Sequence, residues 1–457
     1  MTAPKRFPYR DEIAAVRVEA EPLANDETAA TTRRLAGRVL ARRDMGKLVF
    51  LDLVDRSGRI QLLCPAERTG EIDVHLGDIV GVTGSPSKSR RGEPSLLVES
   101  LELLSRIRTP LPDTFHGLTD VEARYRKRYL DLLMNPESRA DTLIRSAAVA
   151  AIRRTLDGWG FVEVETPELQ PVYGGAFAEP FVTHFNALDA DYYLRIASEL
   201  YLKRLIVGGL EKVYEIGKDF RNEGLSFKHN PEFTMLEWYE AYADYKKTAH
   251  DIELLVSETV ERVLGTTKVA RGEETIDFAP PWKRITLREA IKERAGIDIA
   301  EHPTREALAT AMGSEASPKE GWGKLVDGLL SKAVEPGLIQ PTFILDYPVE
   351  LSPFAKAHPT EEGLVERWEA FVGGVEIANS FSELNDPDEQ RRRFEQQAAE
   401  IERGDEEAQP YDEAFVEALE QGMPPTGGVG LGIDRLVMML TGANSLREVV
   451  LFPAMRT

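Results

Sequence analysis

The stretch DFRNEGLSFKHNPEFTMLEWY, residues 219–239, carries the strongest signal in this sequence. It reads as two strands joined by a polar loop, and it combines an arginine, a histidine and several carboxylates with aromatic side chains. Polar groups of this kind are costly to bury unless they are paired or bind a charged ligand. The stretch therefore predicts a hairpin that holds something charged.

Residue alternation assigns a face to each side chain of this hairpin. In the first strand, Glu215, Arg221 and Glu223 share the polar face, and Tyr214 lies on the core face. In the second strand, Phe233, Glu237 and Tyr239 share one face, and Leu236 and Trp238 take the opposite one. The alternative is an amphipathic hairpin whose polar face is only solvated, since half-solvated antiparallel strands are common. That alternative does not explain why the apolar Phe233 shares the polar face.

The composition limits the classes of protein to consider. The chain has 457 residues, 42% of them hydrophobic, which is typical of a globular protein with two or three domains. It offers no apolar run for a signal peptide or a membrane span, so we expect a cytoplasmic protein with no membrane partner. The single Cys64 excludes an internal disulfide and a cysteine-rich zinc site, and we interpret it as a packed residue.

The charge distribution predicts only local contact with nucleic acid. The formal net charge is −21, which opposes long-range attraction of nucleic acid. Basic residues nevertheless cluster at 33–47, 88–91 and 124–128, and each cluster alone is usually a solvated surface. The first two clusters fall in one small segment, which favours a binding role there.

That segment, residues 30–106, is predicted to be a small β domain that follows an N-terminal arm over residues 1–29. The arm is expected to be poorly ordered or a short helix. Strands are expected at residues 35–40, 48–53, 60–63, 79–84 and 96–103, separated by turn residues. Such a series of short strands fits a closed OB-type barrel that binds single-stranded nucleic acid, with Phe50 and Gln61 on adjacent strands. A structural sandwich without a ligand is the alternative.

Residues 107–457 are predicted to form a second, larger domain. Helices are expected at 118–133 and 137–158, before a strand that Pro167 stops, and another helix begins at Glu199 with Ser198 as N-cap. Residues 246–340 are mostly helical in pattern and suggest a helical insertion. Strands are expected again at 342–345 and within 367–381.

The sequence GGVGLGIDR, residues 427–435, is the third informative stretch. Glycines at alternate positions clear one face of a strand so that a flat ligand can lie against the backbone, and Arg435 then falls in the first turn of an apolar helix. No GK[ST] follows the glycines, so the stretch is not a P-loop.

Taken together, the proline-stopped strand, the Phe-Arg-x-Glu hairpin and the Gly-x-Gly-x-Gly-x-Asp-Arg helix resemble motifs 1, 2 and 3 of class II aminoacyl-tRNA synthetases, in the same order. The segments LRIASELYLKRLIVGG, EIANSFSELNDP and GLGIDRLVMMLTGANSLREVVLFPAMR closely resemble the lysyl-tRNA synthetases of that class. The resemblance runs from about residue 33 to the end and implies an α+β fold. An antiparallel sheet flanked by helices would carry the active site, and the OB barrel would read the anticodon.

The resemblance also implies a reaction, namely ATP-dependent activation of L-lysine to lysyl-adenylate and its transfer to the 3′ end of tRNA(Lys). Catalytic roles on the ATP phosphates are implied for Arg221 and Arg435. The remaining positions that match ATP-binding residues are Glu223, His229, Asn230, Phe233, which would stack on adenine, and Glu376. Those that match lysine-binding residues are Gly175, Glu199, Glu237, Tyr239, Asn379, Phe381 and Glu383. Magnesium carboxylates are implied at Glu369 and Glu376, and anticodon contacts at Arg43, Phe50 and Gln61.

The same resemblance implies a homodimer, because motif 1 lies at the subunit interface of the family. It also exposes differences from the usual family sequence: Glu179 stands where arginine is usual, Phe185 where histidine is usual, and the OB segment is short between residues 64 and 77. Two other hypotheses stay open. One is a synthetase-like paralogue that activates lysine or an analogue for a non-tRNA acceptor, and the other is a non-catalytic RNA-binding or regulatory protein.

Strand alternation adds one structural prediction. Asn379, Phe381 and Glu383 share a face of their strand, but Glu376 does not. If all four line one site, a bulge or turn is needed near residues 378–380.

Overall fold

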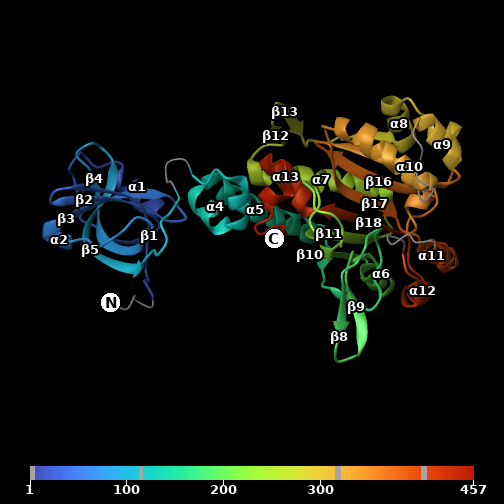
Figure 1. Ribbon diagram of the computed structural model, residues 1–457, viewed down its shortest axis with the longest axis horizontal. Coiled ribbons are helices and arrows are strands. Elements are labelled where there is room, and N and C mark those ends of the chain that lie inside the picture. The colour runs from blue at the N-terminus through green and yellow to red at the C-terminus, as the bar shows by residue number, and fades with distance from the viewer. Residues whose placement is uncertain (1–5, 113–116, 314–320, 403–408, 457) are drawn as a thin grey trace. The chain divides into compact units, whose positions relative to one another are not determined.

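The computed structural model describes residues 6–112, 117–313, 321–402 and 409–456. The chain folds into two compact units, Met1–Val121 and Glu122–Thr457 (Figure 1). Residues 1–5 of the predicted arm lie outside the described residues. No helix in the described residues is long and apolar enough to cross a membrane.

The first unit is a closed five-stranded barrel in the order β1-β2-β3-β5-β4, as the sequence predicts (Figure 1). Its elements are α1 (Ile13–Ala20), β1 (Arg33–Met45), β2 (Leu48–Val54), β3 (Arg59–Pro65), α2 (Ala66–Thr69), β4 (Ile79–Lys88) and β5 (Pro94–Ser105). Within the predicted arm, α1 packs Ile13 and Val16 into the barrel core. Cys64 is fully buried in the same core, and burial raises its thiol pKa to about 12, which leaves it unreactive.

The second unit is built on an eight-stranded sheet in the order β14-β15-β16-β17-β18-β11-β10-β6. Its strands are β6 (Val162–Glu163), β10 (Lys212–Phe220), β11 (Glu232–Ala241), β14 (Lys283–Thr286), β15 (Thr342–Pro348), β16 (Leu364–Val372), β17 (Val375–Ser382) and β18 (Thr426–Gly432). The pairs β6–β10 and β14–β15 are parallel, and all the other neighbours in this sheet are antiparallel. The predicted α+β class is confirmed.

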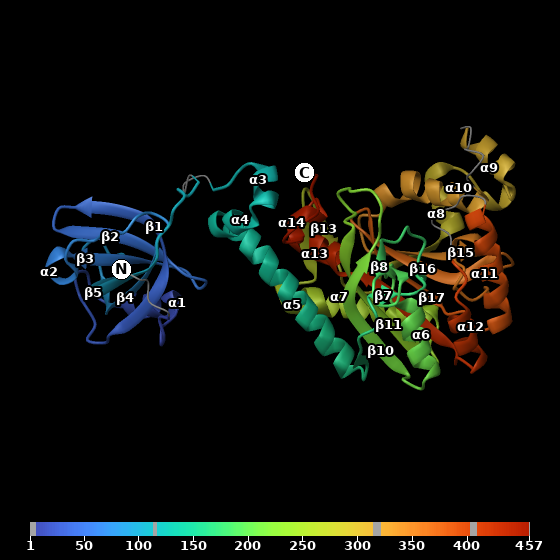
Figure 2. The same cartoon turned by 60° about the horizontal axis from the view of Figure 1, so that its bottom comes forward.

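One face of this sheet is covered by α5 (Pro136–Gly158), α7 (Tyr245–Leu264) and α13 (Ile433–Thr441) (Figure 2). The strands turn Tyr214, Leu236 and Trp238 toward these helices, where all three are fully buried. The predicted alternation of the hairpin is therefore confirmed for the core face. The hydrophobic burial on this side fixes which strand residues face the other way.

The opposite face of the sheet carries two separate clusters. At one end, α8 (Leu287–Ala295), α9 (Arg305–Met312) and α10 (Trp322–Leu329) pack on β15 and β16. At the other end, α6 (Glu199–Val207) and α12 (Glu413–Glu420) pack on β10 and β11. No helix of either cluster packs on the strand surface between them, and the pocket described below lies on that surface.

The remaining α-helices and β-strands of the described residues are short or peripheral. They are α3 (Val121–Arg126), α4 (Arg128–Met134), β7 (Leu169–Gln170), β8 (Val182–Phe185), β9 (Ala190–Leu194), β12 (Lys268–Arg271), β13 (Glu274–Asp277), α11 (Pro387–Glu402) and α14 (Leu446–Val449). The prediction of a single helix at 118–133 is wrong. The helix is interrupted at Lys127, whose ψ of 53° is not helical, so two short helices form instead. The stretch 246–340 also contains strands β12, β13 and β14 beside its helices, and α7 belongs to the main core.

Candidate active site

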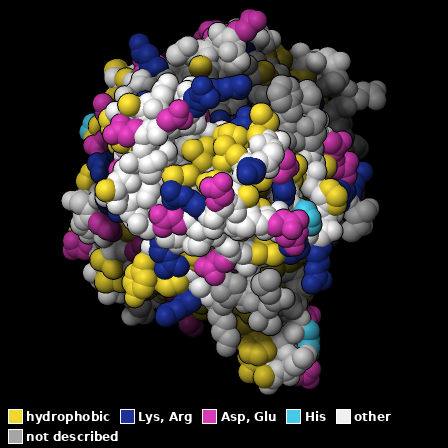
Figure 3. All heavy atoms as spheres, turned by 90° about the vertical axis from the view of Figure 1, so that its left-hand side faces the viewer, with side chains coloured by type: hydrophobic (Ala, Val, Ile, Leu, Met, Phe, Trp, Pro, Cys, Tyr) yellow, Lys and Arg dark blue, Asp and Glu magenta, His cyan; other side chains and the backbone are white. Residues whose placement is uncertain are grey.

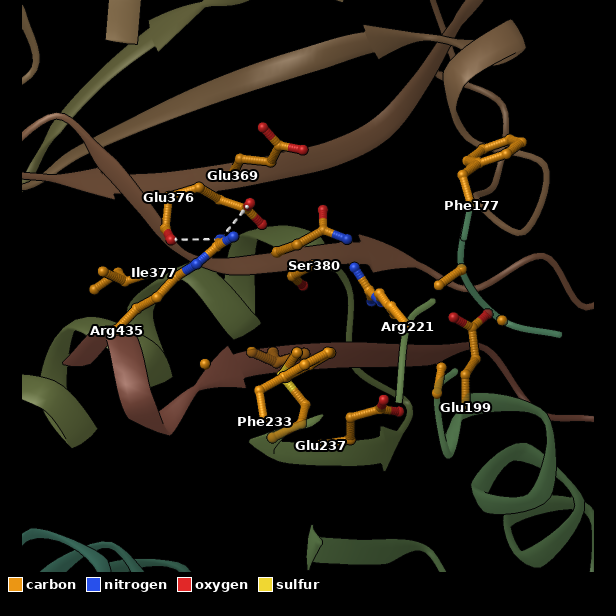
Figure 4. Close-up of a pocket in the computed structure, with 18 of the residues that line it drawn as sticks. Phe177, Glu199, Arg221, Phe233, Glu237, Glu369, Glu376, Ile377, Ser380 and Arg435 are labelled. Carbon is orange, nitrogen blue, oxygen red and sulfur yellow. Dashed lines mark hydrogen bonds and ion pairs between the residues drawn. The ribbon is translucent and has the colours of Figure 1, made fainter. Parts of the chain in front are cut away.

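A pocket opens on the sheet between the two clusters, and strands β11, β16, β17 and β18 form its base (Figure 4). Every residue assigned above to ATP, lysine or magnesium lines it. These residues are Gly175, Glu199, Arg221, Glu223, His229, Asn230, Phe233, Glu237, Tyr239, Glu369, Glu376, Asn379, Phe381, Glu383 and Arg435. They come from segments more than 250 residues apart in sequence, which the sheet order makes neighbours.

A β-bulge in β17 places Glu376 on the pocket face. Ala370 pairs with Ala378 and Phe371 pairs with Glu376, so Ile377 is an extra residue opposite β16. The bulge adjoins the predicted range 378–380 and lies one residue before it. Because of the extra residue, Glu376 and Asn379 line the same pocket although their spacing is odd.

The hairpin differs from expectation in one respect. Strand β10 ends at Phe220, and residues 221–231 form a longer loop than the sequence suggested. Arg221 stays close to the second strand, since its backbone N–H donates to the Pro231 carbonyl over 2.9 Å. Glu223 lies in the loop and is exposed.

The glycines of β18 differ in what lies against them. A Cβ at Gly428 would lie 2.0 Å from Glu383 Oε1 and 2.4 Å from the Tyr239 ring. At Gly430 the nearest atom would be Met235 Sδ at 3.7 Å. Gly428 therefore makes room for protein side chains, whereas Gly430 leaves the pocket open.

At one end of the pocket, three carboxylates are buried. Glu199, Glu237 and Glu383 are no more than 6% exposed. The Glu237 carboxylate accepts from the Ser198 N–H at 3.2 Å and from the Tyr239 hydroxyl at 3.3 Å. The other two carboxylates share an ion pair with Lys203, which sequence reasoning missed.

These surroundings shift the pKa values of the carboxylates. Burial, reinforced by Asp219 and Glu199, raises the pKa of Glu237 to about 8. Burial also raises the pKa of Glu383 well above its ordinary value, against the opposing effect of Lys203. A bound cation would reverse these shifts, so this end of the pocket is suited to positively charged groups.

The other end carries two arginines. The Arg435 guanidinium donates to the Glu376 carboxylate over 2.9 Å and to its backbone carbonyl over 2.8 Å (Figure 4). The Arg221 guanidinium lies 5.1 Å from the centre of the Phe233 ring, and its Nε has no hydrogen-bond partner among the described residues. Burial, followed by Arg435 and Lys228, lowers the pKa of His229 to about 4, so its ring is neutral near pH 7. This end is suited to anions.

The pair Glu369 and Glu376 is the candidate for a divalent cation. The Glu369 carboxylate accepts from Tyr347 at 2.8 Å and from Arg367 at 2.5 Å. Burial raises the pKa of Glu369 to about 7, with Arg367 opposing the rise and Glu376 reinforcing it. Among the described residues, no three His, Cys, Asp or Glu side chains are grouped to hold a metal. Two carboxylates fit a Mg²⁺ that is also held by phosphates and water, rather than a cage made of protein ligands alone.

A buried arginine forms ion pairs with the first strand of the hairpin. Arg195, 1% exposed, donates to Glu215 over 2.6 Å and pairs with Asp219 at 3.1 Å. A Cβ at residue 217 would lie only 2.0 Å from the Arg195 Nη2 atom, so glycine is the residue that fits at this position. Glu215, assigned to the polar face from sequence, is thus paired with protein.

Gln409 holds the loop that contains Gly175, a residue predicted to bind lysine. Gly175 has a φ of +93°, and a Cβ there would lie 2.9 Å from Glu199 Cβ. Gln409 accepts from the Gly175 N–H over 3.0 Å and donates to the Ala176 carbonyl. Glu179 is exposed and does not line the pocket, and its backbone carbonyl accepts from the Asn222 N–H.

In the barrel, the three residues assigned to the anticodon lie on adjacent strands. Arg43 on β1 pairs in register with Phe50 on β2, and its guanidinium is 5.7 Å from the ring centre. Gln61 on β3 pairs with Asp52 and accepts from the Ser95 hydroxyl over 3.2 Å. Figure 3 shows a face of the molecule on which basic and acidic side chains are interspersed rather than separated into one basic surface.

Comparison with known families gives two matches. Residues 120–456 match the family described as tRNA synthetases class II (D, K and N). Residues 34–104 match the OB-fold nucleic acid binding domain. The two matches fall in the two compact units of the chain.

Curated relatives are similar over almost the whole chain. A lysine–tRNA ligase of Dehalococcoides mccartyi (strain 195) is 51% identical over 98% of this chain and 92% of its own length. The lysine–tRNA ligase of Moorella thermoacetica is 51% identical over 98% of this chain and 93% of its own. That of Bacillus subtilis (strain 168) is 51% identical over 94% of this chain and 88% of its own.

Proposed function

Because this chain belongs to the class II tRNA synthetases (D, K and N), we propose that it joins L-lysine to tRNA(Lys) in two steps driven by ATP. In the first step, a lysine carboxylate oxygen attacks the α-phosphorus of ATP and pyrophosphate leaves. In the second step, a ribose hydroxyl at the 3′ end of tRNA attacks the acyl carbon and AMP leaves. Neither step needs a nucleophile from the enzyme, so positioning and charge stabilisation suffice.

The observation that most strongly supports this proposal is the buried group of three carboxylates at one end of the pocket. Lysine has two ammonium groups, and both would be stripped of water there. Glu237 is assigned to the α-ammonium, and Glu199, Tyr239 and Glu383 to the ε-ammonium. Glu383 Oε1 is buried and has no hydrogen-bond partner among the described residues, so it can accept from an incoming ammonium. A leucine or methionine side chain would leave that oxygen unpaired.

The walls beside the ε-ammonium site are assigned to Gly175, Asn379 and Phe381. Gly175 avoids a clash with Glu199 that any Cβ would cause. The Asn379 Oδ1 accepts from Arg367 over 2.9 Å, which fixes the orientation of the amide. These contacts hold the substrate region rigid before lysine binds.

At the other end, Arg221 and Arg435 are assigned to the ATP phosphates and Phe233 to adenine. Charge grows on phosphoryl oxygens during adenylation, and preorganised guanidinium groups stabilise it. Glu223, His229 and Asn230 complete the nucleotide end. The Asn230 amide donates to the Glu232 carbonyl and accepts from the Ala454 N–H, so it also ties the loop to the C-terminal segment.

We assign Mg²⁺ to Glu369 and Glu376. When bound with ATP, the ion would neutralise phosphate charge. Tyr347 and Arg367 orient the first carboxylate, and Arg435 holds the second. Although burial opposes it, Arg435 keeps the pKa of Glu376 below its ordinary value, which leaves this carboxylate ionised.

The remaining proposals assign one role to each of the two units of the chain. We propose that residues 30–106 read the anticodon through Arg43, Phe50 and Gln61, after an arm at 1–29, and that 107–457 is the catalytic domain with an insertion within 246–340. A homodimer is supported by apolar side chains left exposed on motif 1, namely Leu143 on α5 at 69% and Val162 on the edge strand β6 at 50%. We also propose a cytoplasmic location, where tRNA is used in translation.

The central test is ATP–pyrophosphate exchange that depends on L-lysine, followed by charging of purified tRNA(Lys). We expect both activities, and sedimentation should give twice the chain mass. No lysine-stimulated exchange would contradict the proposal. Normal exchange without charging would favour activation of lysine for a different acceptor, and RNA binding without exchange would favour a non-catalytic protein.

The role of the barrel is tested separately. Phe50→Ala removes a stacking platform, so we expect the KM for tRNA to rise about tenfold, at about 1–3 kcal/mol per stacked base, with exchange unchanged. Leu76→Ala, at a residue 47% exposed in the same unit, is the matched control. Equal effects of the two substitutions would refute stacking on Phe50.

A further inference from the structure

Lys203 of α6 is a fully buried cation behind the substrate end of the pocket. Its Nζ is 2.5 Å from Glu199 Oε1 and also pairs with Glu383 Oε2. Glu199 and Glu383 line the pocket, whereas Lys203 does not. The ammonium group therefore supports the two carboxylates from the side away from the ligand.

Aromatic rings surround this ammonium group. The Nζ atom lies 5.3 Å from the ring centre of Phe354, 5.5 Å from that of Phe381, and 6.0 Å from those of Tyr239 and Phe415. The Lys203 side chain has no exposed surface. Rings at such distances attract a cation, and more strongly where water is excluded. The cage thus favours the charged form of Lys203.

The balance of charge at this site is simple. Two carboxylates and one internal ammonium leave a net charge of −1, which one incoming ammonium would cancel. Without the internal ammonium, two carboxylates this close cannot both stay ionised when buried. Lys203 opposes the rise that burial causes in the pKa of both carboxylates, so that both can be ionised once one more cation is bound.

We propose that Lys203 determines specificity by setting the charge of the ε-ammonium site at −1. It acts through Glu199 and Glu383 and is thus a positioning residue that does not touch the substrate. This inference rests on the proposed function, since it concerns recognition of the lysine side chain. A purely structural Lys203 would stabilise the fold without setting the charge that the ligand must bring.

The two possibilities predict opposite results in a double variant. Glu199→Gln alone leaves Glu383 neutralised by Lys203, so the site is neutral and the KM for lysine in exchange should rise on the order of a hundredfold. Adding Lys203→Met restores a net charge of −1. We expect this second substitution to recover at least tenfold of the lost lysine affinity, with the KM for ATP within about threefold of the wild type throughout.

A matched control and a second pair make the test robust. Lys247, which pairs with Glu240 and Asp251 at 2.6 Å each and lies outside the pocket, is replaced in Glu199→Gln/Lys247→Met. That variant should show no recovery. Glu383→Gln/Lys203→Met should recover over Glu383→Gln by the same charge balance, so one poorly folded variant does not decide the outcome.

Absence of recovery in both Lys203 pairs, with wild-type exchange intact, would overturn the role of Lys203 and leave the proposed function standing. Recovery in the Lys247 control, or equal changes in the KM values for lysine and ATP, would also overturn it. Absence of lysine-dependent exchange in the wild type would instead refute the proposed function and this inference with it.

Discussion

The two ends of the pocket hold charge in contrasting ways. At the carboxylate end, the side chains of Glu199 and Glu383 are at most 5% exposed and face a buried lysine. At the arginine end, the Arg435 and Glu376 side chains are 21% and 36% exposed. Buried charge is weakly screened and expensive to leave unpaired, whereas solvated charge is adjustable. The carboxylate end is thus suited to selecting one amino acid, and the arginine end to handling phosphates that arrive and depart.

The largest effect should come from removing a buried carboxylate. We expect Glu383→Gln to raise the KM for lysine by about two to four orders of magnitude, because unpairing a buried charge costs about 3–5 kcal/mol. Exchange kinetics at varied lysine and varied ATP separate the two substrates. Glu240→Gln, a buried carboxylate paired with lysines outside the pocket, is the control. A similar rise in the control would show that the effect is general destabilisation.

At the arginine end the loss should be smaller and should affect ATP. Arg435→Ala removes charged hydrogen bonds worth about 1.5–3 kcal/mol, so kcat/KM for ATP should fall roughly 10- to 150-fold. Lysine binding measured by calorimetry without nucleotide should stay unchanged. A loss of lysine affinity equal to that of ATP would show that the two ends are not independent.

A pair of glycine substitutions sharpens the contrast between protein contacts and ligand space. Gly428→Ala forces a Cβ against Glu383 and Tyr239, so unfolding should occur at lower temperature, at about 1–3 kcal/mol of overpacking. Gly430→Ala meets only Met235 at 3.7 Å and should leave thermal stability unchanged while weakening substrate binding. Melting curves of the two variants, recorded with and without lysine and ATP, separate the effect on stability from the effect on binding. Equal melting temperatures of the two variants without ligand would contradict the packing argument.

The smallest effect concerns pH at the carboxylate end. With a pKa of about 8 in the free protein, Glu237 is mostly protonated at pH 7, and an α-ammonium pairs only with its ionised form. Lysine binding should therefore release a proton at pH 7, and affinity should rise roughly fivefold from pH 7 to pH 8. Calorimetry in buffers of different ionisation enthalpy measures the proton count. The release should disappear in Glu237→Gln, and its persistence there would assign it to another group.

Much of this arrangement follows from local sequence patterns. Period-two alternation placed Tyr214 and Trp238 in the core, and the odd spacing of Glu376 and Asn379 required a bulge that the structure has at Ile377. Alternate glycines predicted the open face of β18. These features depend on strand geometry alone, which repeats every two residues.

Other features depend on contacts that no local pattern encodes. Glu199 and Lys203 have the i,i+4 spacing of a helical ion pair, but the third member, Glu383, is 180 residues away. Arg195 likewise braces the hairpin from outside it. Strands β12, β13 and β14 were missed because four-residue strands leave little alternation to detect. Lys127 interrupts the helix predicted at 118–133 although the charged pattern continues across it.

The extra residue Ile377 lets one strand serve both ends of the pocket, because it offsets the odd spacing of Glu376 and Asn379. Residues on either side of it serve different ends of the pocket, Glu376 beside Arg435 and Asn379 beside Arg367. Regular pairing of all residues from 376 to 379 would turn one of these two groups toward the core, whatever its identity. A break in the strand pairing, and not only the choice of side chains, is therefore a condition for both polar groups to reach the pocket.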